Sequence, residues 1–202
     1  PVEIPSSPQR IVCLDQYSTL ALLDVGVTPT ATIDGLDAWM PENRRKVYNS
    51  LPRVGGYEAN PEKILSHKPD LILGNSAFTL TGSDTYDKLS KIAPTVILTT
   101  ATASQWQKMA LRIADTVNRA EQMEKLRSQY LKKAEGLKNT HSDALANTRF
   151  SLVAAFQSGQ WNLCYPDSWS GAVLADVGCH FGSASAEETG TSGERSFEQF
   201  GQ

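Results

Sequence analysis

The sequence predicts an α/β protein made of two lobes that a single long helix joins. Short apolar runs alternate with helical segments up to Thr100, residues 104–146 lack any strand signal, and strands return at Phe150. Continuous apolar strands that alternate with helices are typical of a parallel sheet covered on both faces. We therefore expect an N-terminal lobe at 1–102, a helical linker region at 103–146 and the start of a C-terminal lobe at 147–202.

Four strands and four helices are expected in the first lobe. The strands are RIVCLD (10–15), TPTATID (28–34), LILG (71–74) and TVILTT (95–100), and the helices are STLALLDVG (18–26), ENRRKVYNS (42–50), PEKILSH (61–67) and YDKLSKIA (86–93). Gly26 suits the end of the first helix. Asn60, Pro61 and Glu62 suit a helix start, because Asn caps free amides, Pro fits the first turn and an acid complements the helix dipole.

The linker region has two apolar helix faces. The first comprises Trp106, Met109, Ile113 and Val117, and the second comprises Met123, Leu126, Tyr130, Ala134 and Leu137. A helix of ~20 residues spans about 30 Å, which is long for a crossover within one sheet and suits a connection between two lobes. The alternative is a long surface helix on one lobe.

The second lobe repeats features of the first. FSLVAAF (150–156) and WNLCY (161–165) are expected strands around a turn at 158–159, and the helix SGAVLADVG (170–178) ends like ALLDVG of the first lobe. SASAEETGTSGE (183–194) reads as a polar loop, and a helix is expected to open near Ser196, as one does at Asn60. The strands before Gln202 are too few to close a self-sufficient sheet, so we expect an incomplete second lobe and a fragment.

Composition and motifs exclude several classes of protein. The net charge of −3 predicts no nucleic-acid partner, and no apolar run is long enough to cross a bilayer. The chain opens on the polar stretch PVEIPSSPQR, as a processed chain would. The three cysteines form no CxxC pair. A disulfide between Cys164 and Cys179 is possible in an oxidising compartment, and the alternative is that both are free and serve as small buried hydrophobic residues. Scattered histidines and the absence of HExxH, Walker and GxGxxG motifs predict no catalytic residue, no metal site and no cofactor.

Aromatic residues follow the ends of the expected strands. In open α/β sheets, ligands bind at the carboxyl ends of the strands. Each aromatic side chain alone would more often be core or surface, but their shared placement predicts a cleft for a bulky, partly apolar ligand held without covalent chemistry. We read Gly55-Gly56 as the turn that lets Tyr57 reach this cleft, not as a phosphate cradle. The expected ligand-binding aromatics are Tyr17, Trp39, Tyr57, Phe78, Trp161 and Trp169.

Four stretches carry a resemblance to a known family. In order and spacing, they resemble the substrate-binding proteins that feed ABC importers of ferric siderophores, haem and cobalamin. The stretches are PQRIVCLDQYSTLALLDVGVTP, VGGYEANPEKILSHKPDLILG, YDKLSKIAPTVIL and CYPDSWSGAVLADVG. The resemblance covers nearly the whole chain. It implies two Rossmann-like α/β lobes joined by one linker helix, a ligand in the cleft, and a periplasmic location or a lipoprotein anchor outside the cell membrane.

The resemblance also implies roles for individual residues. Glu62 and Glu198 match the glutamates, one per lobe, that the family presents to arginines of the membrane permease. The ferric hydroxamate binder of the family has an Arg at the position of Tyr57 and a Tyr at that of Phe78, so this chain lacks both of those polar contacts.

We therefore expect an iron-uptake protein that delivers a ferric siderophore to an ABC importer and is a monomer when full length. The alternatives are cobalamin or haem as ligand, or an enzyme or sensor on a two-lobed scaffold. The basic candidates for an anionic ligand are Arg44, Arg45, Arg53 and Arg195, among which Arg195 is taken as a ligand contact. A strongly anionic ligand needs basic groups in its site, but the residues at the strand ends are aromatic. A ferric hydroxamate or a mixed chelate is therefore favoured as the ligand.

Overall fold

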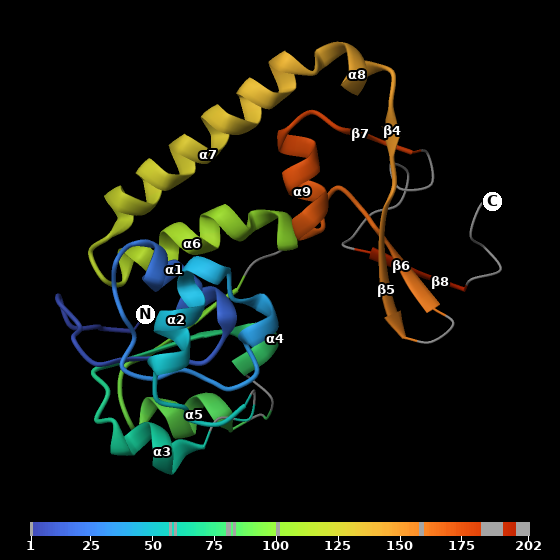
Figure 1. Ribbon diagram of the computed structural model, residues 1–202. Helices are drawn as coiled ribbons and strands as arrows, with labels where there is room; N and C mark the ends of the chain where they lie inside the picture. Colours follow the sequence, from blue (N-terminus) through green and yellow to red (C-terminus); the bar gives the residue numbers. More distant parts are fainter. Residues whose placement is uncertain are drawn as a thin grey trace. The chain divides into compact units, whose positions relative to one another are not determined.

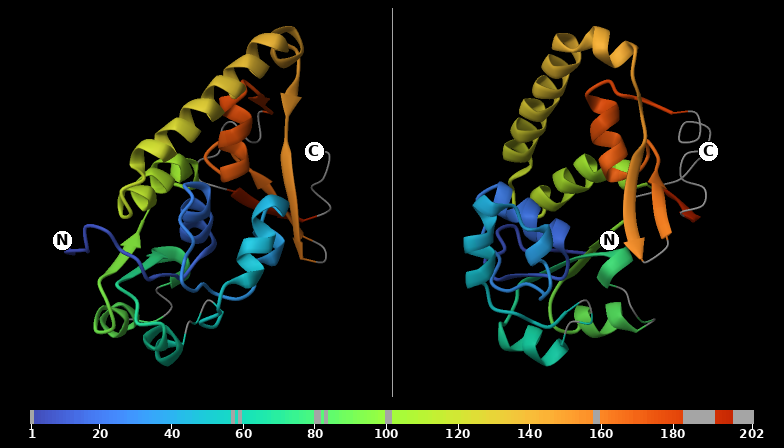
Figure 2. Two further views of the ribbon diagram at one scale, coloured as in Figure 1. Left: turned by 60° about the vertical axis from the view of Figure 1, so that its left-hand side comes forward. Right: turned by 45° about the vertical axis from the view of Figure 1, so that its right-hand side comes forward.

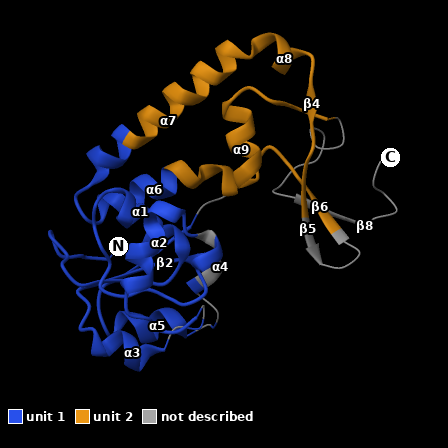
Figure 3. Cartoon of the chain, viewed as in Figure 1, with its two compact units in different colours: residues 1–99, 108–125 blue, residues 100–107, 126–202 orange. Residues whose placement is uncertain are grey.

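The computed structural model describes residues 2–56, 58, 60–79, 82, 84–99, 102–157, 160–182 and 192–196. The chain divides into two compact units (Figure 3). Unit 1 comprises residues 1–99 and 108–125, and unit 2 comprises residues 100–107 and 126–202. The domain ranges expected from the sequence were inferred from secondary structure and not from contacts, so they stay a prediction. They are 1–102, 103–146 and 147–202.

Unit 1 is built on a parallel sheet (Figure 1). Strands β1 (Ile11–Cys13), β2 (Leu71–Asn75) and β3 (Thr95–Leu98) lie in the order β1-β2-β3. Two parallel bridges, Val12 to Ala31 and Thr32 to Arg53, add two further segments beside β1. The segment TPTATID is therefore a bridge at 31–32 rather than a full strand, whereas the expected parallel sheet is confirmed.

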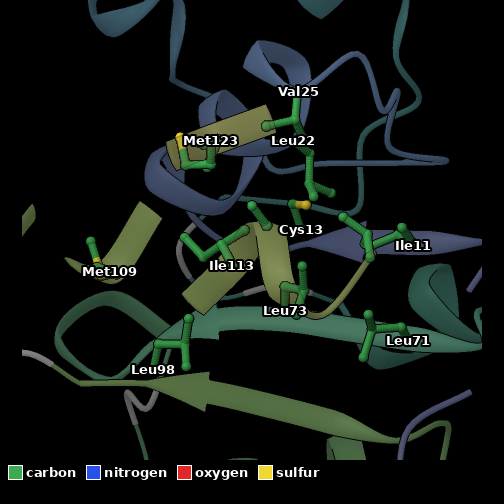
Figure 4. Packing of buried hydrophobic residues seen from close by; sticks show 13 residues of the cluster. Ile11, Cys13, Leu22, Val25, Leu71, Leu73, Leu98, Met109, Ile113 and Met123 are labelled. Carbon is green, nitrogen blue, oxygen red and sulfur yellow. The ribbon is translucent and has the colours of Figure 1, made fainter. Parts of the chain in front are cut away.

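Alternate residues of β1 and β2 enter two separate cores, as expected for strands buried on both faces. On one face Ile11, Cys13, Leu71 and Leu73 pack with α1 (Gln16–Asp24) and with α6 (Trp106–Asp115), which supplies Met109 and Ile113 (Figure 4). On the other face Val12, Leu14 and Ile72 pack with α2 (Glu42–Ser50), α3 (Pro61–Ser66) and α5 (Thr85–Ser90).

Helix ends in unit 1 follow the local sequence. Asn60 caps α3, because its side chain accepts hydrogen bonds from the amides of Glu62 and Lys63, which confirms the expected start. After α1, Gly26 has a φ of +77°, a conformation that glycine adopts without strain. Helix α2 is largely polar, but it buries Tyr48 completely. The Tyr48 hydroxyl donates to the carbonyl of Ile33 at 3.2 Å and accepts from the amide of Leu36 at 3.1 Å, so its polar end is satisfied.

The long helix is α7 (Ala120–Thr140), with 21 residues, and it begins in unit 1 and continues in unit 2. Figure 2 shows it as one unbroken helix in both further views. Its covered face is formed by Met123, Arg127, Tyr130 and Ala134, which are spaced by four, three and four residues. Leu126 and Leu137, expected on that face, are 38% and 42% exposed because this spacing places them beside it.

In its described residues, unit 2 contains two small sheets. Strands β4 (Arg149–Phe150) and β7 (His180–Phe181) pair in parallel, and β5 (Leu152–Gln157), β6 (Gln160–Cys164) and β8 (Ser192–Ser196) form an antiparallel sheet in the order β5-β6-β8. Helix α9 (Trp169–Asp176) is followed by Gly178, whose φ of +86° matches that of Gly26 after α1. The repeated sequence ALLDVG and VLADVG thus encodes the same helix stop. The short elements η1 (Asp37–Trp39), α4 (Ser76–Thr79), η2 (Ala103–Gln105) and α8 (Ser142–Ala146) complete the described secondary structure.

A strand occupies the stretch just before the helix expected near Ser196, and that helix itself falls on residues outside the described part of the chain. Residues 192–196 form β8, which pairs with β6 and places Arg195 opposite Trp161. Serine, glycine and glutamate have low strand propensity, but pairing with β6 supplies partners for the backbone groups and overrides it. Glu198 and the other residues at 197–202 lie outside the described part of the chain.

A polar cluster within unit 2 joins α9 to the first two residues of α6 and to the part of α7 from Leu126 onward. The Asp176 carboxylate of α9 accepts from the Tyr130 hydroxyl at 2.7 Å and from the Gln107 side-chain amide at 3.2 Å. Arg127 donates to the Gln107 oxygen at 3.1 Å, and the Trp106 ring meets Tyr130 edge-on with centroids 5.4 Å apart. Burial and the Asp176 carboxylate raise the pKa of Tyr130, so its hydroxyl stays a donor.

Candidate functional site

The strand order of unit 1 defines one edge of the sheet as a candidate ligand site. Numbered along the chain, the segments at 11–13, 31–32, 53, 71–75 and 95–98 are the first to the fifth, and in space they lie in the order 3-2-1-4-5. The order reverses between β1 and β2, because the chain goes to one side of β1 for the next two segments and then to the other side. Open α/β sheets bind ligands beyond the carboxyl ends of the strands at such a switch point.

Asp15 is the first polar residue beyond β1 and is 0% exposed. Its carboxylate accepts from the amide of Ser18 at 2.9 Å and from the Ser18 hydroxyl at 2.8 Å, and so caps α1. The backbones of Tyr17 and Asn75 lie close to this carboxylate. Burial raises the pKa of Asp15 above its usual range, and its hydrogen bonds with Ser18 oppose part of that rise.

Asn75 is the last residue of β2 and leads directly into α4. Its side-chain amide lies 3.1 Å from the sulfur of Met109, and its backbone amide lies 3.1 Å from the Thr79 hydroxyl. A side chain at Gly74 would come within 2.8 Å of Thr79 Cγ2, so only glycine lets α4 lie this close to the strand. The turn after β2 is therefore packed closely onto the end of the strand.

The structure brings two of the expected contacts of unit 1 to this edge. Tyr17 is the second residue of α1 and is half-buried, and Phe78 belongs to α4, which follows β2. Trp39 is the last residue of η1. The structure does not describe the side chains of Trp39 and Phe78. Tyr57 lies outside the described residues altogether.

Two of the expected contacts of unit 2 lie on neighbouring strands, Trp161 in β6 and Arg195 in β8, whereas Trp169 begins α9. Trp161 is 8% exposed and packs with Leu163 and Tyr165, so it belongs to the small core of that unit. Trp169 is the first residue of α9, behind the Ser168 cap, and is half-buried. Arg195 is the register partner of Trp161, and its side chain is not among those described. That Trp161, Trp169 and Arg195 contact the ligand stays a prediction.

The basic candidates of unit 1 already have partners. Arg44 pairs with Asp24 at 3.1 Å, and Arg53 pairs with Asp34 at 3.6 Å. The Arg53 guanidinium also stacks 3.9 Å from the centre of the Tyr48 ring. Arg45 donates to the carbonyl of Met40 at 3.2 Å. An anionic ligand at the strand edge would compete with these partners.

Within the described ranges, no three His, Cys, Asp or Glu side chains gather as a metal site would require. The cysteines Cys13, Cys164 and Cys179 are all free, so the possible disulfide between the last two is not formed. Within the same ranges, no helix combines the length and the apolar character that crossing a membrane needs.

Sequence reasoning missed Asp15 and Asn75. Both follow directly on buried apolar runs, IVCL and LILG, and a polar residue at the carboxyl end of a buried strand is the signal that could have found them. Their proximity could not be read from the sequence, because it depends on the order of strands in the sheet.

Comparison with known proteins places most of the chain within one family. The family model described as "Periplasmic binding protein" matches residues 11–200. A probable siderophore-binding lipoprotein, YfiY of Bacillus subtilis, is 33% identical over 178 residues, which cover 87% of this chain and 53% of that protein. The Fe(3+) dicitrate-binding periplasmic protein FecB of Escherichia coli is 29% identical, with 91% of this chain and 60% of FecB covered.

Solved structures agree with the sequence matches. The siderophore periplasmic binding protein from the fuscachelin gene cluster of Thermobifida fusca superposes with a TM-score of 0.80 and 27% identity, covering 96% of this chain and 72% of that one. The two-lobed α/β fold with a linker helix is thereby confirmed. The chain spans about half the length of the curated relatives it matches, 53% of YfiY and 60% of FecB.

Proposed function

The chain belongs to the periplasmic binding protein family, and on that premise we propose that it binds a ferric siderophore and delivers it to an ABC importer. The observation that carries the proposal is the family match over residues 11–200. The structure adds a sheet edge at a topological switch point, where this fold class binds ligands, with Tyr17 in the first turn of α1, the helix that follows β1. The protein is then a binding component that needs no catalytic residue or cofactor, not an enzyme or sensor.

Relatives support iron chelates as the ligand class. YfiY is named for siderophore binding, and YxeB of Bacillus subtilis, 32% identical over 68% of this chain, is named for binding iron(3+) hydroxamate. SirA of Staphylococcus aureus, solved with staphyloferrin B, superposes with a TM-score of 0.75 at 25% identity. Cobalamin or haem on the same architecture is the alternative ligand.

The partners of the arginines favour a ligand of low charge. Arg44 and Arg53 are each paired with an aspartate, so they bring little free positive charge to a triscatecholate complex. A strongly anionic ligand that leaves water needs unpaired cations in its site. We therefore favour a ferric hydroxamate or a mixed chelate.

Titration of the full-length gene product tests ligand class and charge together. The chain has four tryptophans, so quenching of their fluorescence reports binding. We expect ferrioxamine to bind at least about tenfold more tightly than ferric enterobactin, a difference of about 1.4 kcal/mol. Tighter binding of ferric enterobactin or ferric dicitrate would refute the preference for low charge. Quenching by cobalamin or haem alone would establish the alternative ligand, and chemical turnover would refute a binding protein.

The family also supports a partner and a location. Relatives named as lipoproteins or periplasmic proteins act outside the cytoplasm, so we place this protein in the periplasm or on a lipid anchor at the outer side of the cell membrane. Its partner would be the membrane permease, which Glu62 and Glu198 would contact. Glu62 is exposed in the first turn of α3. The full-length protein would act as a monomer and bind no nucleic acid.

A further inference from the structure

We propose that Thr79 is a positioning residue whose hydroxyl closes the turn after β2 onto the end of that strand, and so fixes the backbone that carries Phe78 at the ligand-binding edge. Thr79 touches no ligand in this proposal. The inference rests on the proposed function only in naming the edge as the ligand site, because the contact between Thr79 and β2 lies within unit 1.

The last backbone amide of β2 faces the side of the strand on which β1 lies. Successive amides of a strand between two parallel neighbours point to alternate sides. The amide of Leu71 donates to the carbonyl of Arg10, on the side of β1, and the amide of Ile72 donates to that of Pro94, on the side of β3. The amide of Asn75 therefore points the same way as that of Leu71, into the switch point.

On that side β1 has already ended. Its last residue, Cys13, is the register partner of Leu73, and Asn75 comes two residues later in β2. A buried amide beyond the end of its neighbouring strand needs another acceptor. The Thr79 hydroxyl oxygen lies 3.1 Å from this amide, and Asn75 and Thr79 are 7% and 3% exposed. The hydroxyl thus supplies the acceptor and draws the last residue of α4 onto the strand.

The fit of Thr79 against the sheet is close. A Cβ at Gly74 would overlap the Thr79 hydroxyl oxygen and lie 2.8 Å from Thr79 Cγ2. It would also lie 3.0 Å from Cδ1 of Ile97, which is the register partner of Gly74 in β3. Helix α4 therefore has no room to move further toward the sheet, and its hydrogen bond to Asn75 keeps it from moving away. Phe78 directly precedes Thr79, so the same contact sets the position of its backbone.

Thr95 offers a matched control at the opposite edge of the sheet. It is the first residue of β3, is 1% exposed, and donates its hydroxyl to the carbonyl of Ala93 at 2.9 Å. Thr79 and Thr95 are thus both buried threonines of unit 1 whose hydroxyls bond to nearby backbone. Only Thr79 does so at the carboxyl ends of the strands, where ligands bind in this fold class.

Amide hydrogen exchange measured by NMR tests the contact without any ligand. In Thr79→Val we expect about tenfold faster exchange at Asn75, because valine keeps the shape of the side chain and removes the acceptor. Thr79→Ser keeps the hydroxyl and should keep the protection, and Thr95→Val should leave Asn75 unchanged. If Thr79→Val does not fold, Thr79→Ala replaces it with the same expected pattern. Unchanged exchange at Asn75 would show that another acceptor, such as the nearby Asp15 carboxylate, holds the amide, and would overturn the proposal.

Ligand titration of the full-length gene product completes the test. At a temperature where all variants are folded, Thr79→Val should weaken ferrioxamine binding about fivefold, whereas Thr79→Ser and Thr95→Val should stay within about twofold of the wild type. In a Phe78→Ala background, Thr79→Val should weaken binding by less than about twofold more, because it acts through the position of Phe78. Equal losses in the two valine variants, or losses of Thr79→Val and Phe78→Ala that add in full, would overturn the positioning role. A wild-type protein that binds no ferric siderophore would refute the proposed function, while the exchange experiment would still decide whether Thr79 closes the turn.

Discussion

The buried carboxylate of Asp15 makes the stability of unit 1 depend on pH. Asp15 is 0% exposed, and burial raises its pKa in the folded state above the value of an unfolded chain. A raised folded pKa means that the folded state holds its proton more tightly than the unfolded state does. The stability that Asp15 contributes is therefore fully present below the unfolded pKa and is lost as the pH rises through the folded pKa. Cys13 lies nearby, and burial raises the pKa of its thiol, so it stays neutral throughout this range.

Replacing Asp15 by asparagine should remove this dependence. Between the unfolded pKa and the raised folded pKa, the free energy of unfolding of the wild type should fall with increasing pH relative to that of Asp15→Asn. Urea unfolding of both proteins at a series of pH values from the acid range to neutrality measures this difference. The substitution also alters hydrogen bonds at every pH, and this shifts the whole stability profile by a constant. Comparing the slopes of the free energy of unfolding against pH removes that constant. Parallel stability profiles for the two proteins would show that the pKa of Asp15 is the same folded and unfolded.

Secondary structure was best predicted where a local signal is complete. The start of α3 followed from Asn60 and Pro61, whose roles depend only on adjacent backbone amides. Strand β8 was missed, because residues 192–196 have no strand propensity of their own and become a strand only by pairing with β6. The segment at 28–34 was overestimated for a similar reason, since its contact with β1 is a single bridge.

Gly171 shows how one residue type can decide the fit of a helix. It is buried in the first turn of α9, and a Cβ there would overlap the carbonyl oxygen of Tyr165 and lie 2.7 Å from the Ser168 hydroxyl oxygen. Because Tyr165 is 2% exposed, its backbone cannot move aside cheaply. We expect Gly171→Ala to lower the free energy of unfolding by about 1–3 kcal/mol, as overpacking does.

The control for this prediction is Gly136→Ala in α7. A Cβ at Gly136 meets nothing within 4 Å, so alanine there should stabilise the protein by about 0.5–1 kcal/mol through its higher helix propensity. Thermal or urea unfolding followed by circular dichroism measures both changes. A Gly171→Ala protein as stable as the wild type would mean that α9 can shift away from Tyr165.

At the scale of the whole molecule, the sequence predicted the fold better than the site. Alternating apolar runs and helices are local patterns, so two α/β lobes and a long helix could be read from them. The edge at β1 and β2 depends on the spatial order of strands, which brings Asp15 next to Asn75 across a long separation in the chain. Tyr17 was predicted as a ligand contact from its place shortly after a strand, and it stays a prediction; that strand lies beside the switch point.

Transport should depend on Glu62 in a way that ligand binding does not. Glu62 is exposed in the first turn of α3, where the amide ends of the helix stabilise a carboxylate even without a partner. An exposed charge of this kind mainly steers and orients an encounter, which in our proposal is the encounter with basic groups of the permease. In the full-length protein we expect Glu62→Ala to keep its affinity for ferrioxamine and to reduce uptake of iron from it by about twofold to tenfold. Glu198→Ala should act in the same direction, and the double variant most strongly.

Glu42 supplies the matched control for this prediction, because it is likewise an exposed glutamate in the first turn of a unit 1 helix, α2. Its helix follows Pro41, and the family resemblance gives Glu42 no partner. Uptake of radioactive iron by cells that carry each variant, at equal protein levels, separates the two positions. We expect Glu42→Ala to transport at the wild-type rate, which would assign the loss in Glu62→Ala to a specific contact. Equal rates for all variants, or equal losses at Glu42 and Glu62, would show that Glu62 is an ordinary helix-start acid and that the permease is met elsewhere.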